Sequence, residues 1–180
     1  MIEVIVAFDE SNGIGKGGLL PWHLPEDLNH FRNITIYGTK TDKVLSGDPI
    51  MMNNVIMGSA TWESLPPNVR PLPLRINHVV TSRDHSLFEG ASVHKSLKGA
   101  IKEAERVGGN IIIIGGSSIY SQILEMDHIP IRLHVTRILG EFNCDKFFPD
   151  CLTESDRVYQ SKVHRSANSG LEYQFEIYEL

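Results

Sequence analysis

The sequence lacks the features that mark several large classes of protein. Of its 180 residues only two are cysteines, Cys144 and Cys151, and neither has companions at a spacing typical of metal ligands. No apolar run reaches the roughly 20 residues of a transmembrane helix, and the N-terminus lacks the basic segment of a leader peptide. We therefore expect reduced thiols, no bound metal, no membrane association and a cytoplasmic protein.

Positive charge is also scarce, because 17 Lys and Arg face 22 Asp and Glu, which gives a net charge of -5 and a pI near 5.9. Proteins that bind nucleic acid usually carry a basic patch, so we expect no nucleic-acid partner and a small ligand. A chain of this length can bury roughly 70% of its unfolded surface, and no repeat or linker divides it. One domain over 1–180, present as a monomer, is expected.

Apolar runs alternate with helical patterns along the chain, which is typical of an α/β fold. Strands are predicted over 2–8, 55–58, 76–81, 91–94, 110–116 and 131–138, and helices are predicted to follow Leu24, the cap Ser59, the cap Ser96 and Gly116. Four isoleucines, 111–114, have no polar face, as expected of a central parallel strand. Segments 157–164 and 171–178 predict an antiparallel C-terminal hairpin. The polar stretch 36–54 has no clear period and is predicted to be an insertion.

One acidic residue lies on the apolar face of a predicted helix. If Pro25 begins the helix, Leu24, Leu28 and Phe31 share that face at helical spacing, and Asp27 occupies its remaining position. Burying an unpaired carboxylate costs on the order of several kcal/mol even after the protein relaxes around it. Three groups would each compensate this charge: the helix dipole, His30 one turn later, or a ligand with two N–H donors. This helix alone does not decide among them.

Two glycine patterns suggest phosphate binding with different strength. Residues 13–18 match Gly-x-Gly-x-x-Gly, but Pro21 follows closely where a dinucleotide fingerprint needs a helix. We interpret this stretch as a flexible loop over a cleft. Small, polar or basic residues also follow three predicted strands, at 58–61, 81–83 and 115–118. Because ligands bind at the carboxyl ends of strands in open α/β sheets, these three ends are predicted to meet at a phosphate-rich cofactor.

The order of these motifs resembles that of the dihydrofolate reductase family over nearly the whole chain. The matching stretches are 5–7, 13–15, 20–22, Asp27, 55–58, 61–62, 70–72, 75–77, 82–83, 114–116, Tyr120, Thr136 and 148–150. The resemblance implies a single-domain fold with a mixed, mostly parallel central sheet, an antiparallel C-terminal hairpin and helices on both faces. Because the sequence ends at Leu180, we expect no fused thymidylate synthase domain.

The resemblance implies NADPH-dependent reduction of 7,8-dihydrofolate to 5,6,7,8-tetrahydrofolate, by hydride transfer to C6 and protonation of N5. This reaction supports one-carbon metabolism and thymidylate synthesis and is the target of antifolate inhibitors. The implied catalytic residues are Asp27, Trp22, Leu20, Tyr120 and Thr136. The implied substrate-binding residues are Ile5, Val6, Ala7, Asp27, Leu28, Phe31, Ser64, Leu65, Leu72, Arg75, Ile114 and Thr136, with Arg75 clamping the glutamate α-carboxylate of the substrate.

The resemblance also implies where NADPH binds. The implied cofactor-binding residues are Ala7, Ile14, Gly15, Gly18, Leu20, Gly58, Ser59, Ala60, Thr61, Thr81, Ser82, Arg83, Lys95, Ile114, Gly115, Gly116, Ser117, Ser118, Ile119 and Tyr120. One departure concerns the position after Gly58, where family members usually carry Arg or Lys and this chain has Ser59. Arg83 and Lys95 must then supply the charge that favours NADPH, and we expect a weakened preference over NADH.

Two other functions remain open. The reductase of the riboflavin pathway is similar in fold and cofactor, but Asp27 after Leu20-Pro21-Trp22, together with Arg75, argues against it. A non-catalytic pterin- or nucleotide-binding module would keep the fold without turnover. Consumption of NADPH that depends on added dihydrofolate separates these possibilities.

Overall fold

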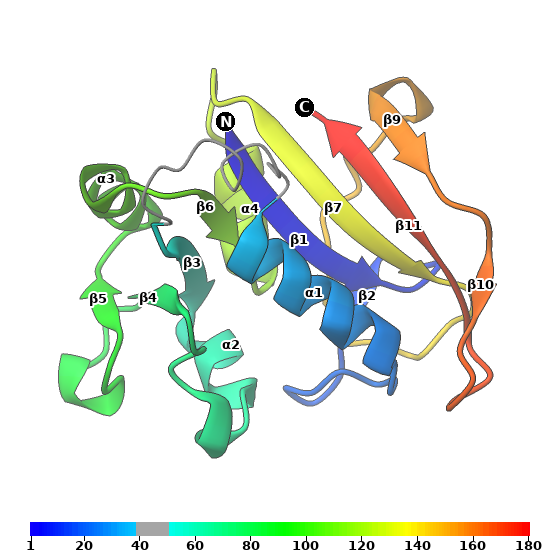
Figure 1. The fold of residues 1–180 in the computed structure, drawn as a ribbon, viewed down its shortest axis with the longest axis horizontal. Coiled ribbons are helices and arrows are strands. Elements are labelled where there is room, and N and C mark those ends of the chain that lie inside the picture. The colour runs from blue at the N-terminus through cyan, green and yellow to red at the C-terminus, as the bar shows by residue number, and fades with distance from the viewer. Residues whose placement is uncertain (39–50) are drawn as a thin grey trace.

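In the described part of the chain, a sheet of nine strands forms the centre of the molecule (Figure 1). The computed structural model describes residues 1–38 and 51–180. The strands of this sheet are β1 (Ile2–Phe8), β3 (Asn53–Gly58), β4 (Arg75–Val80), β5 (Ser92–His94), β6 (Ile111–Ile113), β7 (Ile131–Ile138), β9 (Arg157–Gln160), β10 (His164–Arg165) and β11 (Glu172–Glu179). Their order is β10-β11-β7-β1-β6-β3-β4-β5, with β9 also paired to β11. A separate pair is formed by β2 (Gly13–Gly15) and β8 (Lys146–Phe147).

The sheet is parallel from β7 across to β5 and antiparallel at its C-terminal edge. β1 pairs in parallel with β6 and β7, whereas β11 pairs antiparallel with β7, β9 and β10. The predicted antiparallel C-terminal hairpin is therefore confirmed. Its first strand is divided into β9 and β10, so the single segment predicted over 157–164 is interrupted.

Helices cover both faces of the sheet, as predicted. They are α1 (Pro25–Tyr37), α2 (Ser59–Ser64), α3 (Leu97–Val107) and α4 (Ser117–Leu124), with short 3-10 turns at Pro67–Val69, His85–Leu87 and Glu154–Asp156. In Figure 1, α1 crosses in front of the sheet and α4 lies behind it. None of the helices within 1–38 and 51–180 is long and apolar enough to cross a membrane.

The apolar pattern of the strands explains this layering. Val4 and Val6 of β1 pack with α3 and α4, whereas Ile5 between them packs on the opposite side with α1 and α2. The isoleucines of β6 divide in the same way: Ile111 and Ile113 face one layer, and Ile112 faces the other. Successive strand side chains point to opposite faces, so a strand without a polar face must be covered twice.

Two predicted helix caps had different outcomes. Ser96 caps α3, where its hydroxyl accepts a hydrogen bond from Gly99 N at 3.2 Å, and Gly108 ends the helix. The prediction that Ser59 caps α2 was wrong, because Ser59 is already its first helical residue and Gly58 precedes it without a side-chain cap. The reason is that β3 passes into α2 with no intervening residue, which leaves no position for a separate cap.

The predicted insertion over 36–54 was only partly accessible to a test. Its first two residues belong to α1 and its last two to β3, so the ends of the stretch are regular structure. Within the remainder, 39–50 lies outside the described residues.

Candidate active site

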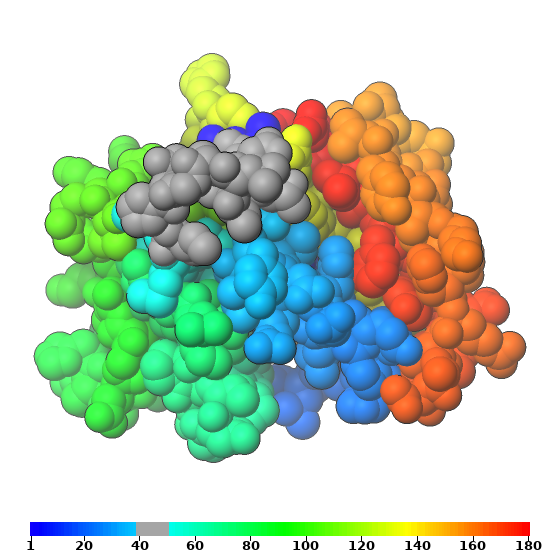
Figure 2. All heavy atoms as spheres, viewed as in Figure 1, coloured from blue at the N-terminus to red at the C-terminus, as the bar shows by residue number. Residues whose placement is uncertain are grey.

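A cleft of about 320 Å³ lies at the carboxyl ends of β1 and β6, where α1, α2, α4 and the loop after β2 meet. Its lining is Ile5, Val6, Ala7, Ile14, Gly15, Gly18, Leu19, Leu20, Asp27, Leu28, Phe31, Ala60, Thr61, Ser64, Leu65, Ile114, Gly116, Ser117, Tyr120 and Lys146. Among these described residues only Asp27 and Lys146 carry a charge at neutral pH. On the face shown in Figure 2, the blue residues of α1 lie between the green and the orange parts of the chain.

Asp27 is the buried charge of this cleft. Its side chain projects from the first turn of α1 and only 7% of the residue is exposed. Burial raises the pKa of its carboxyl to about 6, and the nearby Thr136 hydroxyl opposes this rise. Within the described parts of the chain, no lysine, arginine or histidine forms an ion pair with it. Residues 1–38 and 51–180 therefore supply no ion-pair partner for this carboxylate.

The proposed pair between Asp27 and His30 does not form. The His30 ring packs on Phe175 with 4.2 Å between ring centroids, and burial lowers the pKa of this imidazole to about 4. His30 is therefore neutral at physiological pH and is used for packing. The helix dipole still acts on Asp27, but its first-turn effect, typically about 0.3 to 1 kcal/mol, is smaller than the cost of burying a carboxylate.

Two further buried polar atoms, Trp22 Nε1 and Thr136 Oγ1, have no hydrogen-bond partner within 3.5 Å among the described residues, although the Thr136 hydroxyl lies close enough to Asp27 to lower the pKa of its carboxyl. Thr136 comes from β7, where it pairs with Ala7 of β1, and it is fully buried. Trp22 lies just before α1 and is 7% exposed. Buried polar groups are normally hydrogen-bonded, so two such atoms are what a site built for a polar ligand or ordered water would contain.

Most of the predicted apolar wall lines the cleft. Leu28 is 51% exposed although it lies on the apolar stripe of α1, because that stripe turns from the core toward the cleft here. Ile5, Val6, Ala7, Phe31, Ser64, Leu65 and Ile114 also line it. Leu72 does not, because it is buried in the core beside Trp62 and Phe88. The apolar stripe of α1 is therefore buried in the core over only part of its length.

Arg75 lies outside the cleft lining. It is 9% exposed, and its guanidinium donates to Thr35 Oγ1 at 2.8 Å and to the Pro73 carbonyl at 2.9 Å. Burial, followed by repulsion from Arg32, lowers the pKa of this guanidinium to about 10. Two arginines thus share one region near the end of α1, a pairing that the sequence analysis did not anticipate.

The glycine-rich loop forms one edge of the cleft. Gly13–Gly15 forms β2 and not the turn of a dinucleotide fingerprint, so the rejection of that motif is confirmed. Gly15, Gly18 and Leu20 line the cleft as expected, and Leu19, which was not predicted, lines it too. Leu19 and Leu20 are 66% and 49% exposed, so this edge presents apolar side chains that a ligand can cover.

The ends of β3 and β6 converge as predicted. Gly58 N donates to the Gly115 carbonyl at 2.8 Å, and a Cβ on Gly116 would lie 3.3 Å from Thr61 Oγ1. Gly115 has a φ of 100°, and a Cβ there would lie 2.7 Å from the Tyr120 hydroxyl oxygen. Glycine is therefore required at position 115. Gly116 and Ser117 bring the N-terminus of α4 to the cleft wall, a position that favours anions.

The Tyr120 hydroxyl is buried and hydrogen-bonded to the protein backbone. It donates to the Ile5 carbonyl at 2.8 Å, and burial together with the Asp27 carboxylate raises its pKa. Tyr120 therefore stays protonated and braces β1 at the point where the strand meets the cleft.

The third predicted strand end does not reach the cleft. Arg83 forms an ion pair with Glu63 and lies over the Phe88 ring at 5.6 Å, and Thr81 N donates to the His94 carbonyl. The predicted cofactor residues that lie outside the cleft lining are Gly58, Ser59, Thr81, Ser82, Arg83, Lys95, Gly115, Ser118 and Ile119. Of these, Ser82, Arg83, Lys95 and Ser118 are exposed on the surface.

Comparison with known proteins decides what kind of cleft this is. The family model described as dihydrofolate reductase matches residues 1–180. The chain is 38% identical to the dihydrofolate reductase of Schistosoma mansoni over 82% of this chain and 77% of the relative. It is 36% identical to that of Pneumocystis carinii over 95% of this chain and 84% of the relative, and 35% identical to that of Sus scrofa over 99% and 97%.

The chain belongs to the dihydrofolate reductase family. It is therefore an oxidoreductase, and its fold is the α/β fold of that family. The match covers the whole chain, so the alternative of a riboflavin-pathway reductase is not needed to explain any part of it. In this member of the family, Leu19 and Lys146 are cleft residues that the sequence analysis missed.

Proposed function

We propose that this protein reduces 7,8-dihydrofolate to 5,6,7,8-tetrahydrofolate with NADPH as the hydride donor, and that Asp27 recognises the pterin. The observation that carries the proposal is a buried carboxylate that forms no ion pair with any described residue, on the wall of a mostly apolar cleft. Membership of the dihydrofolate reductase family supports the same reaction.

The chemistry of the pterin edge fits this carboxylate. Its 2-amino group and N3–H present two parallel donors, which match the two oxygens of Asp27. Hydrogen bonds to a charged group contribute about 1.5 to 3 kcal/mol each, enough to offset much of the cost of burial. Because the bound donors favour the ionised form, binding is expected to lower the pKa of Asp27 from about 6.

Thr136 and Trp22 lie outside the cleft lining, and in this proposal they support Asp27 from the protein side. Trp22 Nε1, which has no partner among the described residues, is suited to hold an ordered water beside Asp27, and the Thr136 hydroxyl supports the carboxylate itself. The apolar residues Ile5, Leu28 and Phe31 would wall the rings. Classical antifolate inhibitors that present the same amidine-like edge are proposed to bind here too.

The rest of the cleft fits NADPH. Gly116 and Ser117 at the N-terminus of α4, with Thr61 beside them, offer N–H and hydroxyl groups to a diphosphate. The cofactor supplies the hydride that is transferred to C6 of the pterin. The chain aligns the two rings and excludes water. Since Tyr120 is held by the Ile5 carbonyl, the proton for N5 is proposed to come from water while Asp27 orients the ring.

The test is an assay of NADPH oxidation by the purified protein, followed by absorbance, with and without 7,8-dihydrofolate. Oxidation that requires dihydrofolate and yields tetrahydrofolate is the expected result. Binding of both ligands without oxidation would instead identify a non-catalytic binding module. Oxidation supported by a ribosylated pyrimidine and not by dihydrofolate would identify the riboflavin-pathway reaction.

A further inference from the structure

Lys146 is the cation of the cleft, and neither the sequence motifs nor the family resemblance pointed to it. It is the first residue of β8, it pairs with Gly15 of β2, and it lines the cleft. The residue is exposed, and no carboxylate in the described segments forms an ion pair with it. Its charge is therefore available to a ligand.

The other cations expected to hold the cofactor are absent from the cleft or already engaged. Ser59 and Ala60 follow Gly58, where a basic residue was expected, and neither can balance a phosphate charge. Arg83 is paired with Glu63 outside the cleft lining. The N-terminus of α4 contributes only a partial positive charge. A diphosphate in this cleft therefore needs a full positive charge from another element.

The backbone beneath Lys146 is firmly tied to the glycine-rich loop. Asp145 N donates to the Gly15 carbonyl at 2.9 Å, and the Asp145 carboxylate accepts from Gly17 N at 2.8 Å. On the other side, Phe148 N donates to the Asn12 carbonyl at 2.8 Å, and the buried Phe148 ring stacks on Phe8. Lys146 is thus held in a fixed relation to Gly15 and Gly18, which line the same cleft.

We propose that Lys146 binds the diphosphate of the cofactor from the β8 side of the cleft, together with Gly116 and Ser117, in place of the basic residue missing after Gly58. This inference rests on the proposed use of NADPH. Lys146 acts as a binding residue: its ammonium contacts the phosphate oxygens, and it exchanges no proton or electron with the reacting atoms.

The experiment measures equilibrium dissociation constants of the protein without substrate, by calorimetry, for NADPH and for 2′-phospho-ADP-ribose. The second probe keeps the diphosphate and the 2′-phosphate of the cofactor and lacks nicotinamide. For Lys146→Met we expect about tenfold weaker binding of both, equivalent to the loss of one charge-assisted contact. Lys146→Arg should restore most of the affinity. Raised salt should weaken binding to the wild type more than to Lys146→Met, because salt screens the attraction.

Lys102→Met is the matched control, because it removes the same charge from an exposed lysine of α3 outside the cleft. Its dissociation constants should equal those of the wild type, and dihydrofolate binding should be unchanged in every variant. Equal affinity of Lys146→Met and wild type for NADPH would overturn the inference while leaving the proposed function intact. A loss seen with NADPH but not with 2′-phospho-ADP-ribose would also overturn it, because the contact would then lie at the nicotinamide. A wild type that binds no NADPH would overturn the proposed cofactor itself.

Discussion

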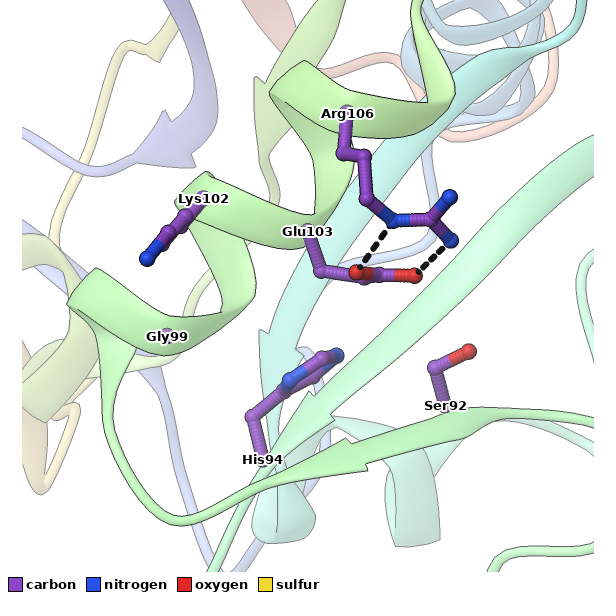
Figure 3. A pocket seen from close by; sticks show the side chains of 6 residues that line it. All are labelled: Ser92, His94, Gly99, Lys102, Glu103 and Arg106. Atoms are coloured by element: carbon purple, nitrogen blue, oxygen red, sulfur yellow. Dashed lines mark hydrogen bonds and ion pairs between the residues drawn. The ribbon is translucent and has the colours of Figure 1, made fainter.

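The cleft and a second pocket of this molecule differ in whether their charges have partners. The second pocket, of about 370 Å³, lies between β5 and α3 and is lined by Ser92, His94, Gly99, Lys102, Glu103 and Arg106 (Figure 3). Arg106 donates two hydrogen bonds to the Glu103 carboxylate, at 3.0 and 2.7 Å, while Lys102 points away from this pair. In the cleft, by contrast, Asp27 has no ion-pair partner among the described residues.

Behind the second pocket, a buried chain of polar groups is also satisfied. The Asn54 amide donates to the Gly108 carbonyl at 2.7 Å, so its oxygen is free to accept from His78 Nε2 at 3.0 Å. His78 Nδ1 is then the acceptor for His94 Nε2, again at 3.0 Å. Each hydrogen bond in this series therefore joins a donor to an acceptor of the neighbouring side chain. The comparison teaches that volume alone does not identify a ligand site, whereas an unpartnered buried charge does.

The strongest way to break this comparison is to remove the Asp27 charge. Asp27→Asn keeps the shape of the side chain but cannot accept two hydrogen bonds from the pterin edge. We expect kcat/KM for dihydrofolate near neutral pH to fall by about a hundredfold or more, the scale of losing a preorganised electrostatic group. The dissociation constant for NADPH should stay unchanged. Near-normal turnover would show that Asp27 is not the pterin-binding carboxylate.

The same substitution should affect stability in the opposite direction. The pKa of Asp27 is raised to about 6 in the folded protein, so between about pH 4 and 6 the folded state binds more protons than the unfolded state, and stability falls as pH rises. At neutral pH, Asp27→Asn should increase the free energy of unfolding by about 1 to 3 kcal/mol. Denaturant titrations should show this gain disappear near pH 4. A variant less stable than wild type at neutral pH would mean that Asp27 is compensated within the protein.

His78 should show the reverse pH dependence. Burial, followed by repulsion from His94 and opposed by Glu103, lowers the pKa of His78 to about 4. The unfolded state therefore binds more protons between about pH 6.5 and 4, and the contribution of His78 to stability is lost as pH falls through that range. His78→Leu leaves Asn54 Oδ1 unpaired and should cost about 1 to 3 kcal/mol at neutral pH.

Denaturant titrations of His78→Leu at several pH values check this, with kcat as the second measurement. The stability gap between wild type and variant should narrow toward pH 4, and kcat should stay within about twofold of wild type because the second pocket is not the cleft. A large loss of kcat with intact stability would assign the His78 and His94 pair a role in catalysis.

The smallest expected effect concerns cofactor preference. Arg83 is held by Glu63 on the surface, so Glu63→Gln should free the guanidinium for the adenosine 2′-phosphate. We expect the ratio of kcat/KM for NADPH over NADH to rise about two- to fivefold, the range of an exposed ion pair. Arg83→Ala should lower that ratio. If wild type uses both cofactors equally and neither substitution changes the ratio, Arg83 does not select the cofactor.

Local sequence patterns predicted much of the fold. The bounds of β1, the start of α1 at Pro25, the buried stripe of α3 and the doubly covered isoleucines of β6 all agree with the structure. These features depend on periodicity, on proline geometry and on caps, each of which acts within a few residues. The same patterns placed Asp27 on the apolar face of its helix, where a charged residue is unusual, and this observation located the site.

Tertiary structure alone decided what surrounds that face. The sequence could not show that His30 packs on Phe175, that Leu28 turns to the cleft, or that Lys146 reaches the cleft from β8. These contacts join segments far apart in the chain, and no local period encodes them. By itself the sequence determined that a carboxylate would be buried on α1. Only the packing of distant strands against that helix decided that Asp27 would have Thr136 of β7 beside it and no cation from the described residues, because the identity of a partner depends on which distant strand lies opposite.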